Sequence, residues 1–222
     1  MQKDLFSTSR ITGLLYLGLA LTGMFAFLFA KSKLYVEGDA VATTTNLISN
    51  QSLARMGLSA ELALVGFQAL VAVWFFKLFK KTDMFAAISL TVFGLVNAVA
   101  ILISNAFWLA ALLLALENPD IANNANQVLV LFNLHEVIWI VSKLFFGLWL
   151  IPMGYLAGLA KMPRFLGWFL IGGGVGYILS AFMSILTPGL ADVNELITIP
   201  ATIGEFWMIG YLLFKKVTAT GK

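Results

Sequence analysis

Six long apolar segments constrain this chain more than any other feature of its sequence. A helix needs about 20 consecutive apolar residues to cross the hydrocarbon of a bilayer. Hydrophobic residues make up 60% of the 222 residues and charged residues only 11%, whereas a soluble domain carries about 25% charged residues. The sequence therefore predicts an all-α fold, a polytopic membrane helix bundle with six transmembrane helices in a single domain over residues 1–222. The predicted spans are 11–30, 57–79, 84–116, 127–160, 165–186 and 196–214.

The positive charges indicate which way the helices cross the membrane. Lys and Arg gather in loops on the cytoplasmic side. Ten of the 14 Lys and Arg residues fall on the side that holds both termini, and only Lys31, Lys33 and Arg55 fall on the other. We therefore expect both termini inside, in a multi-pass protein of the inner (plasma) membrane. The longest external loop, 31–56, is expected to lay a short amphipathic helix on the outer surface.

The charge balance and the residue types exclude several kinds of partner and chemistry. The net charge is +3, but the basic residues lie in short loops and form no soluble patch, so we expect no nucleic-acid partner. The chain has no cysteine and one histidine, which excludes thiolate ligands and three-histidine zinc sites. We therefore expect no metal and no cofactor. Membrane lipids are the expected partners, and the sequence does not indicate an oligomeric state.

Glycine and proline inside the spans predict local packing. Gly172, Gly173, Gly174 and Gly176 lie within an apolar span, without the strand that precedes a dinucleotide-binding glycine motif. We expect this glycine run to permit close helix packing. Pro152 is the expected break in the long fourth span, because proline removes a helical hydrogen bond.

Ionisable side chains inside the spans are candidates for function, because charged groups are costly to bury in hydrocarbon. They are Glu61, His135, Glu136, Lys143 and Glu205. With the predicted topology, all but Lys143 share the outer half of the bilayer, together with Asn105 of the third span. We expect them to line one outward-facing polar pocket, with Lys143 at its base and Trp139 in its apolar wall.

Each candidate also has a structural interpretation. Buried Glu and Lys side chains often pair with each other or with backbone and fix helix packing. Glu61 lies near the end of its span and is expected to reach Arg55 or water, and His135 is equally suited to an interhelical hydrogen bond. Glu136 and Lys143 are seven residues apart, a rise of about 10 Å along a helix, so each needs a partner on another helix or in water.

The order of features from residue 10 onward is similar to that of a known membrane protein family. The matching pieces are Arg-Ile-Thr-Gly-Leu-Leu-Tyr-Leu at 10–17, residues 46–55, His135, Phe-Phe-Gly-Leu-Trp-Leu-Ile-Pro-Met-Gly-Tyr-Leu at 145–156, Pro-Arg-Phe-Leu-Gly at 163–167, and Gly-Tyr at 176–177. In these pieces the chain resembles the bacterial family called domain of unknown function 4386. The resemblance implies a bacterial membrane protein and implies no activity. One departure is Leu-Ala-Arg at 53–55, where the family has Leu-Phe-Arg, so no aromatic contact is implied there.

Three functions are compatible with these residues. The first is binding or transport of a small polar or amphipathic ligand, such as a lipid, with His135, Glu136 and Glu205 as polar contacts and Lys143 as a counter-charge. The second is a membrane-embedded lipid-modifying enzyme with His135 as general base and Glu136 as its partner; whether the protein is an enzyme stays open. The third is a structural or stress-related scaffold.

Overall fold

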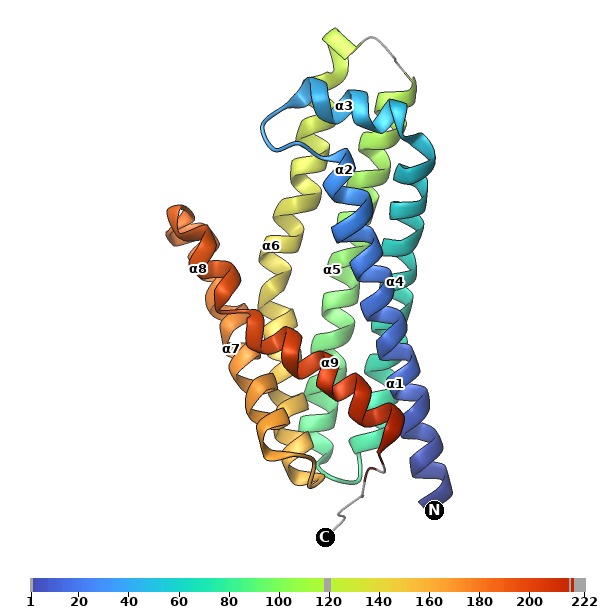
Figure 1. The fold of residues 1–222 in the computed structure, drawn as a ribbon, viewed down its shortest axis with the longest axis vertical. Helices are drawn as coiled ribbons and strands as arrows, with labels where there is room; N and C mark the ends of the chain where they lie inside the picture. The colour runs from blue at the N-terminus through green and yellow to red at the C-terminus, as the bar shows by residue number, and fades with distance from the viewer. Residues whose placement is uncertain (1, 118–120, 216, 218–222) are drawn as a thin grey trace. The chain divides into compact units, whose positions relative to one another are not determined.

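Every element formed by the part of the chain that the structure describes is helical. The structure, a computed structural model, describes residues 2–117, 121–215 and 217 (Figure 1). The elements are α1 (Gln2–Met24), the π-helix η1 (Phe25–Lys31), α2 (Ser32–Leu34), α3 (Ala40–Ser49), α4 (Gln51–Phe79), α5 (Met84–Glu117), α6 (Ile121–Leu159), α7 (Arg164–Leu186), the 3₁₀-helix η2 (Pro188–Leu190), α8 (Ala191–Leu196) and α9 (Ile199–Phe214). The predicted all-α class is confirmed.

Six helical segments are long and apolar enough to cross a membrane, as predicted. They are Phe6–Leu34, Gln51–Phe79, Met84–Glu117, Asn124–Leu159, Arg164–Leu186 and Ala191–Phe214. Large apolar side chains stay exposed along them, with Leu28 at 70% and Phe85 at 82% exposure. Such extended apolar surface is the pattern of helices that face lipid. The chain is therefore a multi-pass membrane protein, and the inward orientation of its termini stays a prediction.

By their internal contacts the residues form two compact units. Unit 1 comprises Met1–Leu17, Phe67–Ala98 and Ile140–Lys222, and unit 2 comprises Gly18–Gly66 and Val99–Trp139. The four helices α1, α4, α5 and α6 contribute residues to both units.

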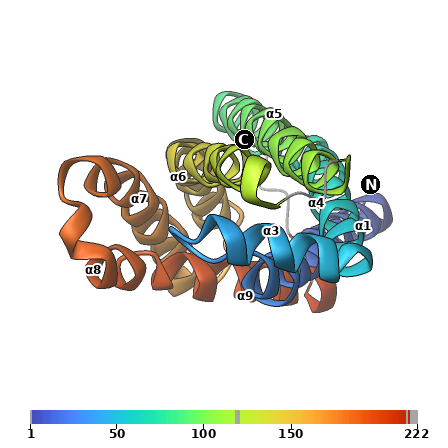
Figure 2. The same ribbon diagram turned by 90° about the horizontal axis from the view of Figure 1, so that it is seen from above.

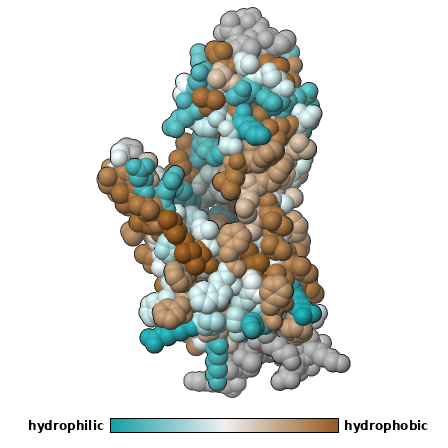
Figure 3. All heavy atoms as spheres, in the orientation of Figure 1, coloured by the Kyte–Doolittle hydropathy of each residue, from teal (hydrophilic) through white to brown (hydrophobic). Residues whose placement is uncertain are grey.

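Unit 2 is built around an apolar core that α3 covers. Trp108, Phe132 and Leu47 are fully buried in this core. α3 lies across the ends of the longer helices of the unit (Figures 1 and 2), and hydrophilic residues gather over it in the space-filling view (Figure 3). Its first turn is capped by Asp39, whose carboxylate accepts a hydrogen bond of 2.8 Å from the Ala42 N–H. The short helix expected within 31–56 is therefore present as α3, and its position on the outer surface of the membrane stays a prediction.

Unit 1 depends on close approach of α6 and α7. A Cβ atom added to Gly154 would lie 2.6 Å from the carbonyl oxygen of Gly167, and one added to Gly174 would lie 2.8 Å from that of Gly147. The two pairs repeat at seven-residue spacing on both helices, so the backbones touch along a seam. Small residues at such a crossing let membrane helices pack without a side chain between them.

The predicted glycine run supports a second close contact in unit 1. A Cβ atom on Gly173 would collide with the backbone of Ala201, and one on Gly176 would collide with the carbonyl of Ile197. α7 and α9 pack against each other, and in Figure 1 the start of α9 lies next to α7. The run therefore permits close packing on two sides of α7, as its composition predicts.

Pro152 does not end its helix, contrary to the sequence prediction. α6 continues through Pro152 from Ile121 to Leu159. Proline removes one helical N–H, and membrane helices tolerate this loss where neighbouring turns and helices keep the backbone satisfied.

Candidate functional site

A group of ionisable residues in unit 2 forms the candidate site. We call it the charged cluster, and it consists of Lys31, Glu61, His135 and Glu136. Lys31 ends η1, Glu61 lies on α4, and the other two lie side by side on α6. Three segments distant in the sequence therefore contribute to one site.

His135 is the centre of the charged cluster. Its imidazole is 0% exposed, with Nδ1 2.9 Å from Oε1 of Glu136 and Nε2 3.0 Å from Oε1 of Glu61. The rings of Trp108 and Phe132 lie 5.3 Å and 5.5 Å from the imidazole, measured between centroids. Both ring nitrogens thus face carboxylates while the ring faces pack against aromatic side chains.

Glu61 accepts hydrogen bonds from several donors and is itself 0% exposed. The indole N–H of Trp139 donates to Oε1 at 2.7 Å, and the side-chain amide of Asn105 donates to Oε2 at 3.2 Å. Indole and amide nitrogens only donate, so both oxygens of the Glu61 carboxyl accept hydrogen bonds, and the imidazole Nε2 lies within hydrogen-bonding distance of both. Burial of Glu61 overturns the expectation that it reaches Arg55 or water, because its carboxylate finds three donors inside the unit.

Glu136 forms the open end of the charged cluster. The Lys31 ammonium donates to its two oxygens at 3.1 Å and 2.8 Å, and the two side chains are 22% and 23% exposed. Lys only donates, so both oxygens of Glu136 accept from Lys31, and Oε1 also lies 2.9 Å from the imidazole Nδ1. Both imidazole nitrogens thus face carboxyl oxygens, an arrangement in which an imidazolium would donate to both acids. With His135 as an imidazolium and both acids ionised, two cations would balance two anions, and the charged cluster would have no net charge.

An aromatic wall borders the open end. The Lys31 ammonium lies 4.9 Å from the centre of the Phe27 ring, and this ring makes an edge contact with Trp139 at 4.4 Å between centroids. Both Phe27 and Lys31 belong to η1. Single π-helical stretches inside α-helices are frequent at functional sites.

Tyr35 lies just beyond the transmembrane segment, near the open end. Its ring stacks on Phe132 at 5.0 Å, and its hydroxyl donates to Oδ1 of Asn133 at 2.8 Å. Burial raises the pKa of Tyr35, and the negative charges of Glu136 and Glu37 raise it further. The hydroxyl therefore stays protonated and remains a donor beside the charged cluster.

Backbone contacts hold the elements in place around the charged cluster. The Ser104 hydroxyl donates to the carbonyl oxygen of His135 at 2.9 Å, which links α5 to α6. The Asn105 amide also donates to the carbonyl oxygen of Leu58 at 3.2 Å, which links α5 to α4. Adjacent polar residues on α5 thus hold the backbone of His135 and the side chain of Glu61.

Of the seven residues predicted for the pocket, five come together in unit 2. They are Glu61, Asn105, His135, Glu136 and Trp139. The other two lie in unit 1, each with a partner there. The Tyr16 hydroxyl donates to Oε1 of Glu205 at 2.5 Å, and the Lys143 ammonium donates to Oγ of Ser180 at 3.1 Å.

Lys31 and Tyr16 are partners that the sequence prediction missed. The sequence prediction places Lys31 in the external loop. Lys31 directly follows the first apolar segment and lies four residues after Phe27, and this spacing places Lys31 and Phe27 on one helical face. Tyr16 carries no such signal, because a buried tyrosine hydroxyl usually finds a hydrogen-bond partner but the sequence does not show which residue that partner is.

The described residues contain no metal centre. No three His, Asp or Glu side chains among them are grouped to hold a metal ion. The donors around Glu61 and Glu136 are cations or N–H groups, which occupy the oxygens that a metal would need.

The comparisons with known proteins identify the family. The family described as domain of unknown function (DUF4386) matches residues 11–215, and the chain belongs to it. This confirms the resemblance carried by the 145–156 block. Comparisons with curated proteins and with solved structures find no match.

Proposed function

We propose that this member of the DUF4386 family binds or transports a small polar or amphipathic ligand at the charged cluster. One observation carries the proposal: four ionisable side chains form one hydrogen-bonded group that is buried at one end and partly exposed at the other. We propose that His135 is protonated in this group and both acids are ionised, so that the group is neutral. The ligand would contact the exposed end, and the buried end would store a proton.

The burial of charge favours a role beyond helix packing. Moving an ion into an apolar interior costs several kcal/mol even after relaxation, and well-packed apolar residues often stabilise a fold equally well. His135 and Glu61 are both fully buried in an apolar core. Ionisable groups kept inside membrane helices usually mark binding or proton-transfer sites.

The exposed end suggests the chemistry of the ligand. An ammonium on a ligand would compete with Lys31 for the Glu136 carboxylate, and the Phe27 ring would stabilise either cation. Phe27 and Trp139 offer an apolar contact next to that position. We therefore propose a ligand that combines an amine with an apolar part.

The neutrality of the charged cluster links ligand binding to a proton. A ligand cation at Glu136, next to the cations of Lys31 and His135, would leave one uncompensated positive charge at low dielectric. Release of the His135 proton would restore neutrality. Binding of a cation and release of this proton would therefore be coupled, and coupling of this kind is reciprocal.

The membrane and its orientation complete the proposal. We place the protein in the bacterial inner (plasma) membrane with both termini in the cytoplasm, as the distribution of Lys and Arg supports. With that orientation Lys31 and Glu136 open toward the outside, where a ligand arriving from the exterior would bind.

The geometry favours the enzyme alternative less. A general base must come within hydrogen-bonding reach of its substrate. Both nitrogens of His135 are occupied by carboxylates, and the imidazole is fully buried. The scaffold alternative differs from the proposal in one measurable respect, which is whether a molecule occupies the exposed end.

Native mass spectrometry of protein extracted gently from its own membrane tests the proposal. The wild type is compared with Glu136→Gln and with the control Glu37→Gln, which changes an exposed acid of the same unit. A discrete adduct in the wild type and control that is lost in Glu136→Gln supports the binding site and identifies the ligand class. No adduct in any of the three, with Glu136→Gln much less stable, would support the scaffold instead.

A further inference from the structure

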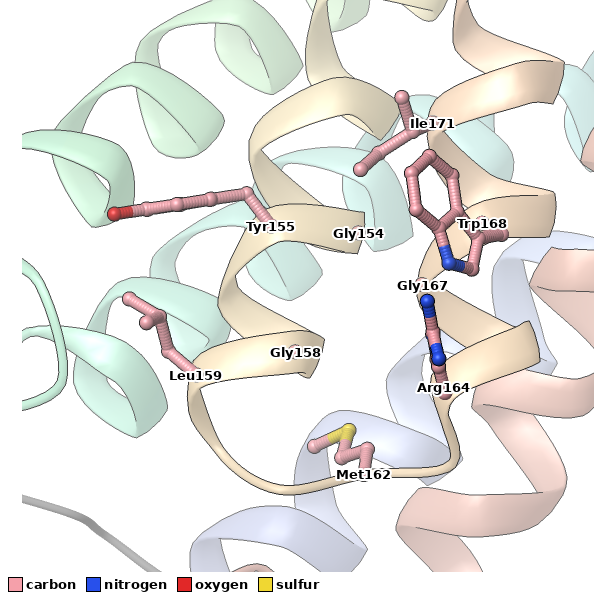
Figure 4. Close-up of a pocket in the computed structure, with 9 residues that line it drawn as sticks. All are labelled: Gly154, Tyr155, Gly158, Leu159, Met162, Arg164, Gly167, Trp168 and Ile171. Atoms are coloured by element: carbon pink, nitrogen blue, oxygen red, sulfur yellow. The ribbon is translucent and has the colours of Figure 1, made fainter.

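A second feature, independent of the charged cluster, is an open groove in unit 1. It lies between the end of α6 and the start of α7, next to the short connection between these two membrane-spanning segments. Its volume is about 360 Å³, within the range of roughly 300–1,000 Å³ that is usual for ligand sites. Figure 4 shows α6 and α7 as its two walls, with Met162 of the connection at one end.

The groove begins where the close contact between the glycines of α6 and α7 ends. At Gly154 and Gly167 the two backbones touch, since a Cβ atom on Gly154 would lie 2.6 Å from the carbonyl oxygen of Gly167. One turn further along α6, no heavy atom lies within 4 Å of the Cβ position of Gly158. The Cβ position of Gly158 therefore faces open space, and the missing side chain leaves a hollow there.

The lining of the groove is apolar except for one cation. Leu159 and Trp168 border it on opposite helices and are 38% and 60% exposed. Arg164 is the one charged residue among those that line the groove. Within the described part of the chain, no carboxylate forms an ion pair with Arg164.

This combination matches one class of membrane component. An apolar hollow on a membrane-spanning segment suits an acyl chain, and an arginine at the boundary of the segment suits a phosphate, which guanidinium binds with two hydrogen bonds. Basic sites between membrane helices are typical positions for anionic lipid head groups. A zwitterionic head group would bring an ammonium as well, and the lining residues include no acid to pair with it.

We propose that this groove is a binding site for an anionic glycerophospholipid. Its acyl chain lies along Gly158 between α6 and α7, and its phosphate pairs with Arg164. The site does not depend on the charged cluster, so each of the two proposals can be tested without the other.

Lipid binding to the purified full chain tests the site. Native mass spectrometry is performed in an equimolar mixture of phosphatidylglycerol and phosphatidylcholine with identical acyl chains. We expect about a tenfold preference for phosphatidylglycerol in the wild type, equivalent to about 1.4 kcal/mol, because the choline ammonium of phosphatidylcholine would lie near the Arg164 cation with no acid in the lining to pair with it. Arg164→Gln removes that preference, and Arg164→Lys restores part of it.

Matched variants separate the groove from general effects. Gly158→Leu fills the hollow and reduces binding of both lipids about tenfold, whereas Gly172→Leu, another helical glycine with open space at its Cβ position, leaves binding unchanged. Lys81→Gln, which removes an exposed cation elsewhere in unit 1, also leaves the preference unchanged. Excess inorganic phosphate does not displace the lipid, because it cannot fill the hollow.

Three results would overturn the proposal. The first is an Arg164→Gln variant that keeps the wild-type preference for phosphatidylglycerol. The second is an equal loss of binding in Gly158→Leu and Gly172→Leu. The third is displacement of the lipid by inorganic phosphate, which would show that a phosphate alone occupies the site.

Discussion

The imidazole Nε2 of His135 lies 3.0 Å from Oε1 of Glu61, and neither side chain has any solvent exposure. This bond joins α6 to α4 inside the apolar core of unit 2. Because each group is the counter-ion of the other, removal of either one leaves a buried charge without compensation. The consequences for stability and for protonation are both measurable.

The first prediction concerns loss of the buried carboxylate. Glu61→Gln lowers the free energy of unfolding in detergent by about 3 kcal/mol, because breaking a buried ion pair leaves an unpaired charge. Glu37→Gln, at an exposed site, changes it by less than about 0.5 kcal/mol. An effect of Glu61→Gln as small as that of the control would contradict the ion pair.

A double-mutant cycle measures the coupling between the two residues. Glu61→Gln, His135→Gln and the double variant are compared by unfolding in detergent. Neighbours in one network couple by about 0.5–3 kcal/mol, and we expect at least about 1.5 kcal/mol here, with the double variant more stable than the sum of the single losses implies. Additive losses would mean that the two side chains act independently.

The open end of the charged cluster has a smaller effect on stability. Lys31→Gln lowers the free energy of unfolding by about 1 kcal/mol, because Lys31 and Glu136 are both partly exposed and water screens their attraction. Thermal unfolding of Lys31→Gln and Glu61→Gln, measured under the same conditions, tests whether Glu61→Gln loses more stability than Lys31→Gln. A larger loss for Lys31→Gln would place the main stabilising contact at the exposed end.

The glycine seam of unit 1 gives a prediction that depends on position along one helix. Gly154→Ala lowers the melting temperature, because the new methyl group meets the carbonyl oxygen of Gly167, whereas Gly158→Ala has space for it. Alanine is favoured over glycine in a helix by about 1 kcal/mol, so Gly158→Ala raises the melting temperature slightly. Equal effects of both substitutions would contradict the close approach of α6 and α7.

The hydrogen bond between Tyr16 and Glu205 makes a separate prediction in unit 1. Tyr16 is 2% exposed and donates to the Glu205 carboxyl, so Tyr16→Phe leaves that carboxyl without its donor and costs about 1–3 kcal/mol of stability. Tyr155→Phe, at a tyrosine that is 48% exposed, is the control and stays within about 0.5 kcal/mol of the wild type. Unfolding in detergent compares the stability of the two variants. Equal effects would contradict a stabilising hydrogen bond between Tyr16 and Glu205.

The sequence predicts the helices well because hydrocarbon imposes a simple rule on length and polarity. Each predicted span has its counterpart in the structure, with ends that differ where η1 and α2 extend the first span and α8 extends the last. The close approach of α6 and α7 is also partly predictable, since the glycines at 172–174 and 176 indicate close helix packing. Their partners at Gly147 and Gly154 lie on another helix, and their pairing follows only from the packed structure.

The sequence predicts which ionisable residues belong to the candidate site, but it does not predict which of them pair with each other. Buried Glu61, His135 and Glu136 are conspicuous in apolar segments, because charge there is expensive. Which residues neutralise them depends on how three helices pack, so neither the Glu61–His135 bond nor the role of Lys31 follows from spacing along one helix. Lys143 and Glu205 illustrate the same limit, since their partners Ser180 and Tyr16 come from other helices.

The proton on His135 is the central claim, and one measurement tests it directly. The chain contains a single histidine, so protein labelled with ¹⁵N-histidine and purified without a histidine tag gives one imidazole in its nitrogen NMR spectrum. We predict that both ring nitrogens carry protons in the wild type at neutral pH, and that Glu61→Gln yields a neutral imidazole, because Lys31 and Glu136 then balance each other. A neutral imidazole in the wild type would contradict the neutral four-residue cluster and the proton exchange proposed for it.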